Sequence, residues 1–431
     1  MEKLSKNISF FNRIKKIIFP FYKSKDIQIL FDILEKNKNK NSQVAMFVGG
    51  CVRKFLTDKN IDDIDIATIF SPEEIKEKFK NSKFKVIGTG IEHGSVTIII
   101  NSSKFEITTL REDTKTDGRH ADVTYTVDWQ KDSARRDFTI NAIYMDRKGK
   151  IYDPQNGRDD LEKKDIKFIG DPFLRIEEDY LRIIRFIRFS IQYNCKQFDL
   201  KTIEAIKFNL NSIKKLSKER VLSELYKIFI LKNINDILEN KDIKDIFLVI
   251  FPEFKYLNRI ESYHYLLKNK IVSQTPEAIF SILLIGEKDN FEYFCHKYKV
   301  SNTLKKYLNY VANNYTKYQE EKNYLKRDLK KNIYKHGKMN INNLINFVYC
   351  AERKFSINLL KKIISDVDKM KVPKFPFNGK YVMDQGIEGG KKIGFVLQEL
   401  EKEWITNNFN LKTQEAIFII DKVKKLNILN I

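Results

Sequence analysis

The sequence has few cysteines and histidines, and none of them is spaced like a metal-binding set. Its 431 residues include five histidines and four cysteines, and the cysteines are far apart, with no C-x-x-C pair. A structural zinc site or a disulfide scaffold is therefore not expected. Reduced thiols in a cytosol fit this pattern best.

Long apolar runs are also missing, and nothing approaches the roughly 20 apolar residues of a transmembrane helix. The N-terminal stretch "ISFFNRIKKIIFPFYKSK" is interrupted by Arg13, Lys15 and Lys16, so it contains no signal-peptide core. We interpret residues 1–30 as a basic extension that either packs on the first domain or touches a membrane, and we favour packing. The predicted location is cytoplasmic, with no membrane association and no obligate protein partner.

Glycine is absent from Asp171 to Ile285, whereas nine of the sixteen glycines lie between Gly49 and Gly170. Helices avoid glycine, and turns and close backbone approaches use it. The glycine-rich region also contains short β-branched runs, and residues 96–100 and 104–110 flank "NSS" like the strands of a hairpin. Beyond it, "EEDYLRIIRFIRFSIQY" and "ERVLSELYKIFIL" have apolar residues at helical spacing. The sequence therefore predicts an α+β protein, with a mixed sheet followed by helical domains.

Positive charge is in excess, with 79 Lys and Arg against 57 Asp and Glu and a formal net charge of +22. Such an excess favours a polyanionic partner such as nucleic acid. Lysine, asparagine and isoleucine are frequent throughout the chain, however, as in proteins from genomes of biased base composition. The charge permits nucleic-acid binding but does not establish it.

Acidic residues follow a glycine turn in "FVGGCVRKFLTDKNIDDIDIAT". If Asp63 and Asp65 lie in a strand, their side chains point to the same face. Adjacent carboxylates repel each other unless a cation lies between them, and Mg²⁺ prefers oxygen ligands. Gly49 and Gly50 would let a phosphate approach the backbone. The alternative is a glycine turn followed by a solvated acidic loop.

Glu106 is the one charged residue in the apolar strand pattern "FEITTL". A third acid near Asp63 and Asp65 would complete a site for two metal ions. An outward-facing glutamate in an alternating strand explains the same spacing, so both interpretations stay open at this point.

These motifs, in this order, resemble the class II tRNA nucleotidyltransferase and poly(A) polymerase family, within the polymerase-β-like nucleotidyltransferases. The matching stretches include "VGGCVR…DDIDIAT", "FEITTLRED", "RRDFTINAIYMD", "DPQNGRDDL" and "FIGDPFLRIEEDYLRIIRFIRF". The resemblance implies a nucleotidyltransferase head with a mixed sheet, followed by all-α neck, body and tail domains. The expected segments are the extension 1–30, the catalytic head 31–150, a nucleotide-selecting neck 151–232, an RNA-binding body 233–370 and a tRNA-binding tail 371–431.

The resemblance also implies roles for single residues. Asp63 and Asp65 would be the Mg²⁺ ligands, and Glu106 would be the third acid of the active site. Gly50 and Arg53 would hold the triphosphate. The whole set that we expect to bind the nucleotide is Gly49, Gly50, Arg53, Arg136, Asp137, Asn141, Asp179, Arg182, Arg185 and Arg188.

The stretch "EEDYLRIIRFIRF" predicts a pair that selects the base. On one continuous helix, Asp179 and Arg182 are three residues apart and share a face, which Arg185 and Arg188 extend. A carboxylate accepts hydrogen bonds and a guanidinium donates them, which complements cytosine and adenine but not guanine and uracil. An ordinary surface ion pair is the alternative. The resemblance favours selection.

We therefore expect a template-independent enzyme that adds CCA to tRNA 3′ ends by two-metal phosphoryl transfer. Its substrates would be tRNA, CTP and ATP, and its cofactor would be Mg²⁺. A poly(A) polymerase, or an enzyme that adds only A or only C, would share the same motifs. A non-catalytic RNA-binding protein is a further alternative, which the clustered Asp63, Asp65 and Glu106 argue against.

Overall fold

The computed structural model describes residues 20–39, 42–90, 94–117, 120–286, 290–321, 323–352 and 355–425. The basic N-terminal stretch lies outside the described residues as far as Phe19. The chain divides into two compact units. The first reaches to Lys255 and includes Glu292–Val300, and the second comprises Tyr256–Phe291 and the chain from Ser301 onward. The finer division into five segments remains a prediction.

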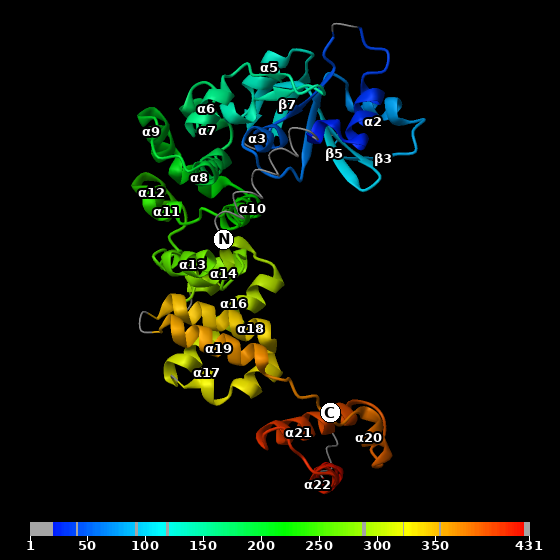
Figure 1. The fold of residues 1–431 in the computed structure, drawn as a ribbon, viewed down its shortest axis with the longest axis vertical. Helices are drawn as coiled ribbons and strands as arrows, with labels where there is room; N and C mark the ends of the chain where they lie inside the picture. The colour runs from blue at the N-terminus through cyan, green and yellow to red at the C-terminus, as the bar shows by residue number, and fades with distance from the viewer. Residues whose placement is uncertain are drawn as a thin grey trace, which may run out of the picture. The chain divides into compact units, whose positions relative to one another are not determined.

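Strands occur among the described residues only as far as Tyr152, and helices follow (Figure 1). Seven strands form one mixed sheet in the order β3-β4-β5-β2-β1-β8-β9, in which only β2 and β5 run parallel. The sheet strands are β1 Ala45–Val48, β2 Ile64–Thr68, β3 Lys85–Gly90, β4 Ser95–Ile100, β5 Ser103–Thr109, β8 Tyr144–Met145 and β9 Ile151–Tyr152. A second, two-stranded sheet pairs β6 Arg111–Asp117 with β7 His120–Tyr125. The predicted α+β class is confirmed.

The predicted hairpin is present as β4 and β5. Ile100 pairs with Ser103, so Asn101 and Ser102 form the turn. Asn101 has a φ of 53°, in the left-handed region that asparagine tolerates better than most residues. The turn therefore pins the register of the two strands that flank it.

The two faces of the sheet differ in polarity because successive side chains in a strand alternate. Ile66, Ile107 and Val96 form one rung across β2, β5 and β4, and all three are buried. Burying one such side chain fully contributes about 1.5–3 kcal/mol. The neighbouring rung, Asp65, Glu106 and Thr97, presents polar groups on the opposite face. The core thus fixes which face carries the acids.

Helices complete the first unit. They are α2 Lys25–Leu34, α3 Gly50–Leu56, α4 Pro72–Phe79, α5 Trp129–Ala134, α6 Gly157–Lys163, α7 Pro172–Glu178, α8 Leu181–Tyr193, α9 Leu200–Asn209, α10 Lys218–Phe229, α11 Asp236–Glu239, α12 Lys241–Ile250 and α15 Asn290–Tyr298. The 3₁₀ turns are η1 Phe21–Lys23, η3 Thr139–Asn141 and η4 Leu210–Lys215. Ile183, Ile184 and Phe186 of helix α8 are fully buried, and the helix packs on α10.

The second unit is helical throughout its described residues. Its helices are α13 Arg259–Lys268, α14 Pro276–Leu284, α16 Asn302–Glu320, α17 Tyr324–Arg327, α18 Leu329–Ala351, α19 Ile357–Lys369, α20 Gly379–Asp384, α21 Lys391–Thr406 and α22 Thr413–Lys425. The proline-containing stretch 370–378 separates α19 from α20. Helices α20, α21 and α22 share a small core of their own, which includes Val382, Val396 and Leu400.

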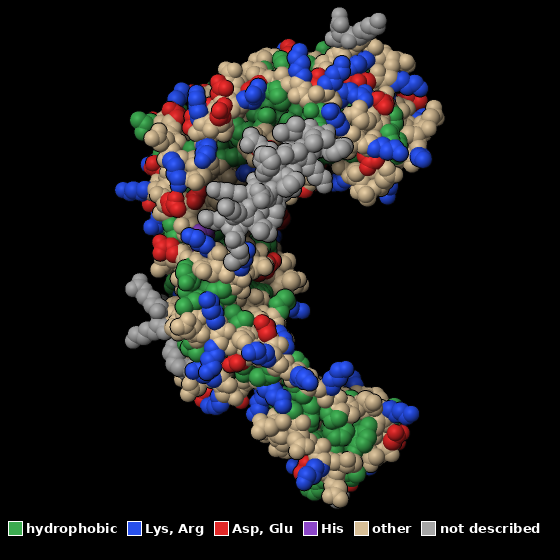
Figure 2. All heavy atoms as spheres, viewed as in Figure 1, with side chains coloured by type: hydrophobic (Ala, Val, Ile, Leu, Met, Phe, Trp, Pro, Cys, Tyr) green, Lys and Arg blue, Asp and Glu red, His purple; other side chains and the backbone are tan. Residues whose placement is uncertain are grey.

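None of the described helices has the length and hydropathy needed to span a membrane. On the face shown in Figure 2, lysine and arginine side chains are spread over the surface rather than gathered into one patch. The net charge by itself therefore does not point to a site.

Candidate active site

Two carboxylates lie side by side because β2 and β5 are parallel neighbours. Asp65 pairs in register with Glu106, and Asp63 immediately precedes β2 and is exposed. Burial raises the pKa of Asp65, and the charges of Glu106 and Asp63 raise it further. The structure thus brings together the three acids expected from the sequence. Glu106 is exposed in an alternating strand, and the face to which it points is the one that carries Asp65.

The glycine turn lies against these acids. Strand β1 ends at Val48, and Gly49 has a φ of 69° before α3 begins at Gly50. A Cβ at Gly49 or Gly50 would lie 4.0 or 3.8 Å from Asp65 Oδ2. The turn therefore places backbone next to the Asp65 carboxylate, and the left-handed φ at Gly49 strains any other residue.

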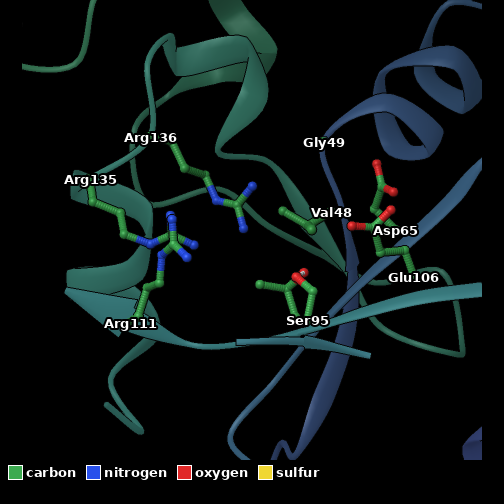
Figure 3. A pocket seen from close by; sticks show the side chains of 9 residues that line it. Val48, Gly49, Asp65, Ser95, Glu106, Arg111, Arg135 and Arg136 are labelled. Atoms are coloured by element: carbon green, nitrogen blue, oxygen red, sulfur yellow. Dashed lines mark hydrogen bonds between the residues drawn. The ribbon is translucent and has the colours of Figure 1, made fainter. Parts of the chain in front are cut away.

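Three arginines face the acids across a hollow of about 480 Å³. Arg111, Arg135 and Arg136 lie on one side of it and Asp65 and Glu106 on the other (Figure 3). The remaining lining residues are Val48, Gly49, Ser95 and Thr108. We call Arg111, Arg135 and Arg136 the arginine wall. Guanidinium groups bind phosphate oxygens with paired hydrogen bonds, so the wall suits a phosphorylated ligand.

One buried carboxylate holds the arginine wall in place. Asp132 is fully buried, and its two oxygens accept hydrogen bonds from Arg135 at 2.8 Å and from Arg136 at 3.0 Å. The same carboxylate accepts from Tyr144 Oη at 2.6 Å and from the backbone N–H of Arg111 at 3.2 Å. Burial alone would raise the pKa of Asp132, but the charges of Arg136 and Arg135 lower it well below its usual range. Asp132 is therefore ionised and joins all three arginines.

Asp137 does not line the hollow. Its carboxylate accepts hydrogen bonds from Arg185 Nε at 2.7 Å and from Asn141 Nδ2 at 2.6 Å. Burial opposes ionisation, but the Arg185 charge holds the pKa of Asp137 below its usual range. Arg53, which is almost fully buried, donates to Asn141 and to Tyr193. These residues join the head to α8, and their expected contact with nucleotide remains a prediction.

The expected helix through Asp179 and Arg182 is wrong. The chain breaks between α7 and α8, and Asp179 adopts extended backbone, with φ −156° and ψ 104°. Its Oδ1 accepts from the Leu181 N–H, and its Oδ2 pairs with Arg220 at 2.7 Å. Both contacts hold the Asp179 side chain outside α8, which is the position that an aspartate often takes at the start of a helix.

Arg182 pairs instead with Glu178, at 2.5 Å, and also donates to the Arg175 carbonyl oxygen at 2.6 Å. Arg188 pairs with buried Glu224 at 2.7 Å. The selecting role of Asp179 and Arg182 stays a prediction, and in this structure both groups bind protein partners.

Sequence reasoning missed several residues around the hollow. Arg111, Arg135, Asp132, Ser95 and Thr108 were not among the expected site residues. Asp132 had a readable signal, because it lies three and four residues before Arg135 and Arg136 at helical spacing. Arg111 begins β6, and its backbone N–H meets the Asp132 carboxylate, 21 residues further along the chain, which the sequence does not reveal.

The carboxylates are suited in kind to a divalent cation. Their oxygen donors match a hard ion, and the pKa of Asp65 is raised first by burial and then by the neighbouring charges of Glu106 and Asp63. Within the described ranges, however, no three His, Cys, Asp or Glu side chains already converge on one point. The acids would have to turn toward one another to share an ion.

The comparisons with known proteins agree along the chain. The family model described as "Poly A polymerase head domain" matches residues 45–167, and "Probable RNA and SrmB- binding site of polymerase A" matches residues 197–257. The chain is 30% identical to "CCA tRNA nucleotidyltransferase 1, mitochondrial" from Danio rerio, over 96% of this chain and 98% of that protein. It is also 30% identical to the "CCA-adding enzyme" of Streptococcus uberis, over 88% and 92%.

Solved structures share the fold. The Bacillus stearothermophilus CCA-adding enzyme in complex with CTP has a TM-score of 0.68 at 21% identity, covering 93% of this chain and 98% of that one. The Thermotoga maritima CCA-adding enzyme complexed with tRNA_CCA has a TM-score of 0.59 at 21% identity, covering 94% and 96%.

Proposed function

Since the chain belongs to the family of CCA-adding tRNA nucleotidyltransferases and poly(A) polymerases, and is a nucleotidyltransferase, we propose that it adds CCA to tRNA 3′ ends from CTP and ATP. The observation that carries this proposal is the paired Asp65 and Glu106 facing the arginine wall across one hollow. The similarity extends along nearly the whole length of the tRNA enzymes, which favours tRNA over other RNA.

The arrangement supports transfer of a nucleotidyl group by positioning and charge. In this proposal Arg111, Arg135 and Arg136 bind triphosphate oxygens, and Asp132 keeps the guanidiniums aimed at the hollow. Asp63 and Asp65, with Glu106, would hold two Mg²⁺ ions, which when bound supply charge neutralisation and a more acidic RNA 3′-hydroxyl. Asp65 and Glu106 suit this role because they are carboxylates paired in register on one face of the sheet.

The nucleotide base would be read at the start of α8. Asp179 accepts and Arg182 donates, as the amino group and ring nitrogen of cytosine and adenine require. Base binding there competes with Arg220 for Asp179 and with Glu178 for Arg182. A base that cannot replace those partners leaves buried polar groups unpaired, which is the stronger source of rejection.

We also propose the finer assignments. Residues 31–150 form the catalytic head and 151–232 the nucleotide-selecting neck, while 233–370 and 371–431 bind RNA. The compartment is proposed as cytoplasmic, although the relatives include mitochondrial enzymes.

The decisive experiment supplies purified protein and Mg²⁺ with tRNA that lacks its terminal CCA, and with oligo(A) as a parallel primer. Labelled nucleotides are supplied singly and then CTP and ATP together. Two C and one A on tRNA, followed by a stop, would support the proposal. Long A tails on either primer without C would identify a poly(A) polymerase, and a single A or C product would identify a partial enzyme.

A further inference from the structure

The paired acids stand between two hollows of different character. Asp65 and Glu106 line the 480 Å³ hollow with the arginine wall, and they also line a second hollow of about 320 Å³. The second hollow is completed by Asp63, Ile64 and Lys104. A reaction at these two carboxylates therefore has access from two sides.

Lys104 is placed in the second hollow by the sheet itself. It lies two residues before Glu106 on β5, and residues two apart in a strand share a face. Strand β4 continues the same rung to Ile99, and β3 continues it to Lys85. Lys104 and Lys85 are both exposed, but only Lys104 lines the hollow of the acids.

The two hollows are lined by different numbers of positively charged side chains. The first is lined by three guanidiniums, besides the shared acids. The second has one ammonium, and no described residue forms an ion pair or hydrogen bond with the Lys104 side chain. A lysine that points among carboxylates and stays unpaired is free to bind an anion from outside the chain.

Nucleotidyl transfer brings two anions of different charge to the same acids. A triphosphate carries several negative charges close together, whereas an RNA end carries one per phosphodiester. The arginine wall matches the triphosphate, so the 3′ end of the RNA must enter by the other hollow. We propose that Lys104 binds the last phosphodiester of the RNA primer and places its 3′-hydroxyl at Glu106 and Asp65. This inference rests on the proposed function.

The test uses the full-length protein and tRNA ending in CC, with RNA and ATP varied separately. Lys104→Met should raise KM for the RNA about tenfold, the loss expected for one charge-assisted contact, and leave KM for ATP unchanged. Lys104→Arg should restore it. Lys85→Met is the matched control, and it should behave like the wild type because Lys85 shares the rung but not the hollow.

A chemical change in the RNA identifies the contact directly. A methylphosphonate at the last linkage removes one charge, so it should weaken the wild type about as much as Lys104→Met does. The two changes together should cost no more than either alone. Additive losses, or a KM effect on ATP instead of RNA, would overturn the role of Lys104. If the wild type adds neither C nor A to any RNA, the proposed function itself fails.

Discussion

Asp132→Asn should lower kcat/KM for the nucleotide by more than the accompanying loss of stability explains. Asp132 is fully buried. Its carboxylate accepts hydrogen bonds from the side chains of Arg135, Arg136 and Tyr144 and from the backbone N–H of Arg111. Removing one partner of a buried ion pair costs about 3–5 kcal/mol. The Arg135 and Arg136 side chains are 15% and 17% exposed, so water can partly replace the lost carboxylate. We therefore expect the free energy of unfolding to fall by about 2–3 kcal/mol.

The effect on activity follows from geometry. Without the carboxylate, the guanidiniums of Arg135 and Arg136 lose their anchor and are no longer aimed at the hollow. We expect kcat/KM for CTP to fall about 30-fold, or about 2 kcal/mol of transition-state binding. The assay is single-nucleotide addition on tRNA lacking CCA, well below the unfolding midpoint of the variant.

Asp160→Asn is the matched control. Asp160 is also buried, and it pairs with Lys167 at 2.5 Å and accepts from Thr139 Oγ1 at 2.7 Å. It does not line the hollow. Its loss should destabilise the protein and leave kcat/KM for CTP within about twofold of the wild type, since no arginine of the wall depends on it.

The sign of the effect tests the reasoning. Neutralising Asp132 makes the wall more positive, so attraction of the triphosphate by charge alone would tighten binding of CTP. If Asp132 acts by positioning the arginines, its neutralisation should instead weaken binding of CTP. A lower KM for CTP in Asp132→Asn, or an equal loss of activity in Asp160→Asn, would refute the claim that Asp132 acts by aiming the arginines.

Three further predictions follow from the same structure. Asp65→Asn should abolish incorporation while tRNA binding, measured by filter retention, stays at the wild-type level; retained turnover would contradict its role as a metal ligand. Glu178→Gln should loosen Arg182 and raise misincorporation of UTP and GTP in single-turnover assays, whereas unchanged selectivity would argue against base reading by Arg182. All four cysteines are buried, and burial raises the pKa of Cys51 to about 11, so its thiolate fraction at pH 8 is about a thousandth. A thiol reagent should therefore label the native protein slowly and the unfolded protein at four sites, and rapid native labelling would contradict the burial.

Features that depend on residues close together in the sequence could be predicted from it. The β-branched runs at 96–100 and 104–110, on either side of "NSS", predicted the β4–β5 hairpin, and the D-x-D spacing predicted that Asp63 and Asp65 lie together. The closeness of Glu106 to Asp65 depends on the pairing of β2 with β5, which are about 40 residues apart, so spacing alone left it open. The place of Arg111 in the wall depends on another long-range contact, that of its backbone N–H with Asp132, 21 residues further along the chain.

The break at Asp179 shows where helical periodicity fails. The stretch from Glu177 to Phe189 has apolar residues at helical spacing and contains neither glycine nor proline, so Asp179 itself, a residue that favours helix starts, is the one local sign of an interruption. Arg220, 41 residues further on, holds the Asp179 carboxylate outside the helix. The Asp179 carboxylate thus has one local partner, the Leu181 N–H, and one distant partner, Arg220, and only the first can be read from neighbouring residues.

The contacts of Glu178 link the proposed base reader to the arginine wall. Arg182, the proposed reader, shares the Glu178 carboxylate with Arg175, at 2.5 Å each. Arg175 in turn donates to the carbonyl oxygens of Arg135 and Arg136, at 2.5 and 2.6 Å. A base that draws Arg182 away from Glu178 changes the partners of Arg175, and through them the backbone that carries two arginines of the wall. One continuous set of hydrogen bonds therefore joins the proposed base reader in α8 to the backbone of the arginine wall, and on the proposed function a wrong base should slow the step that follows its binding.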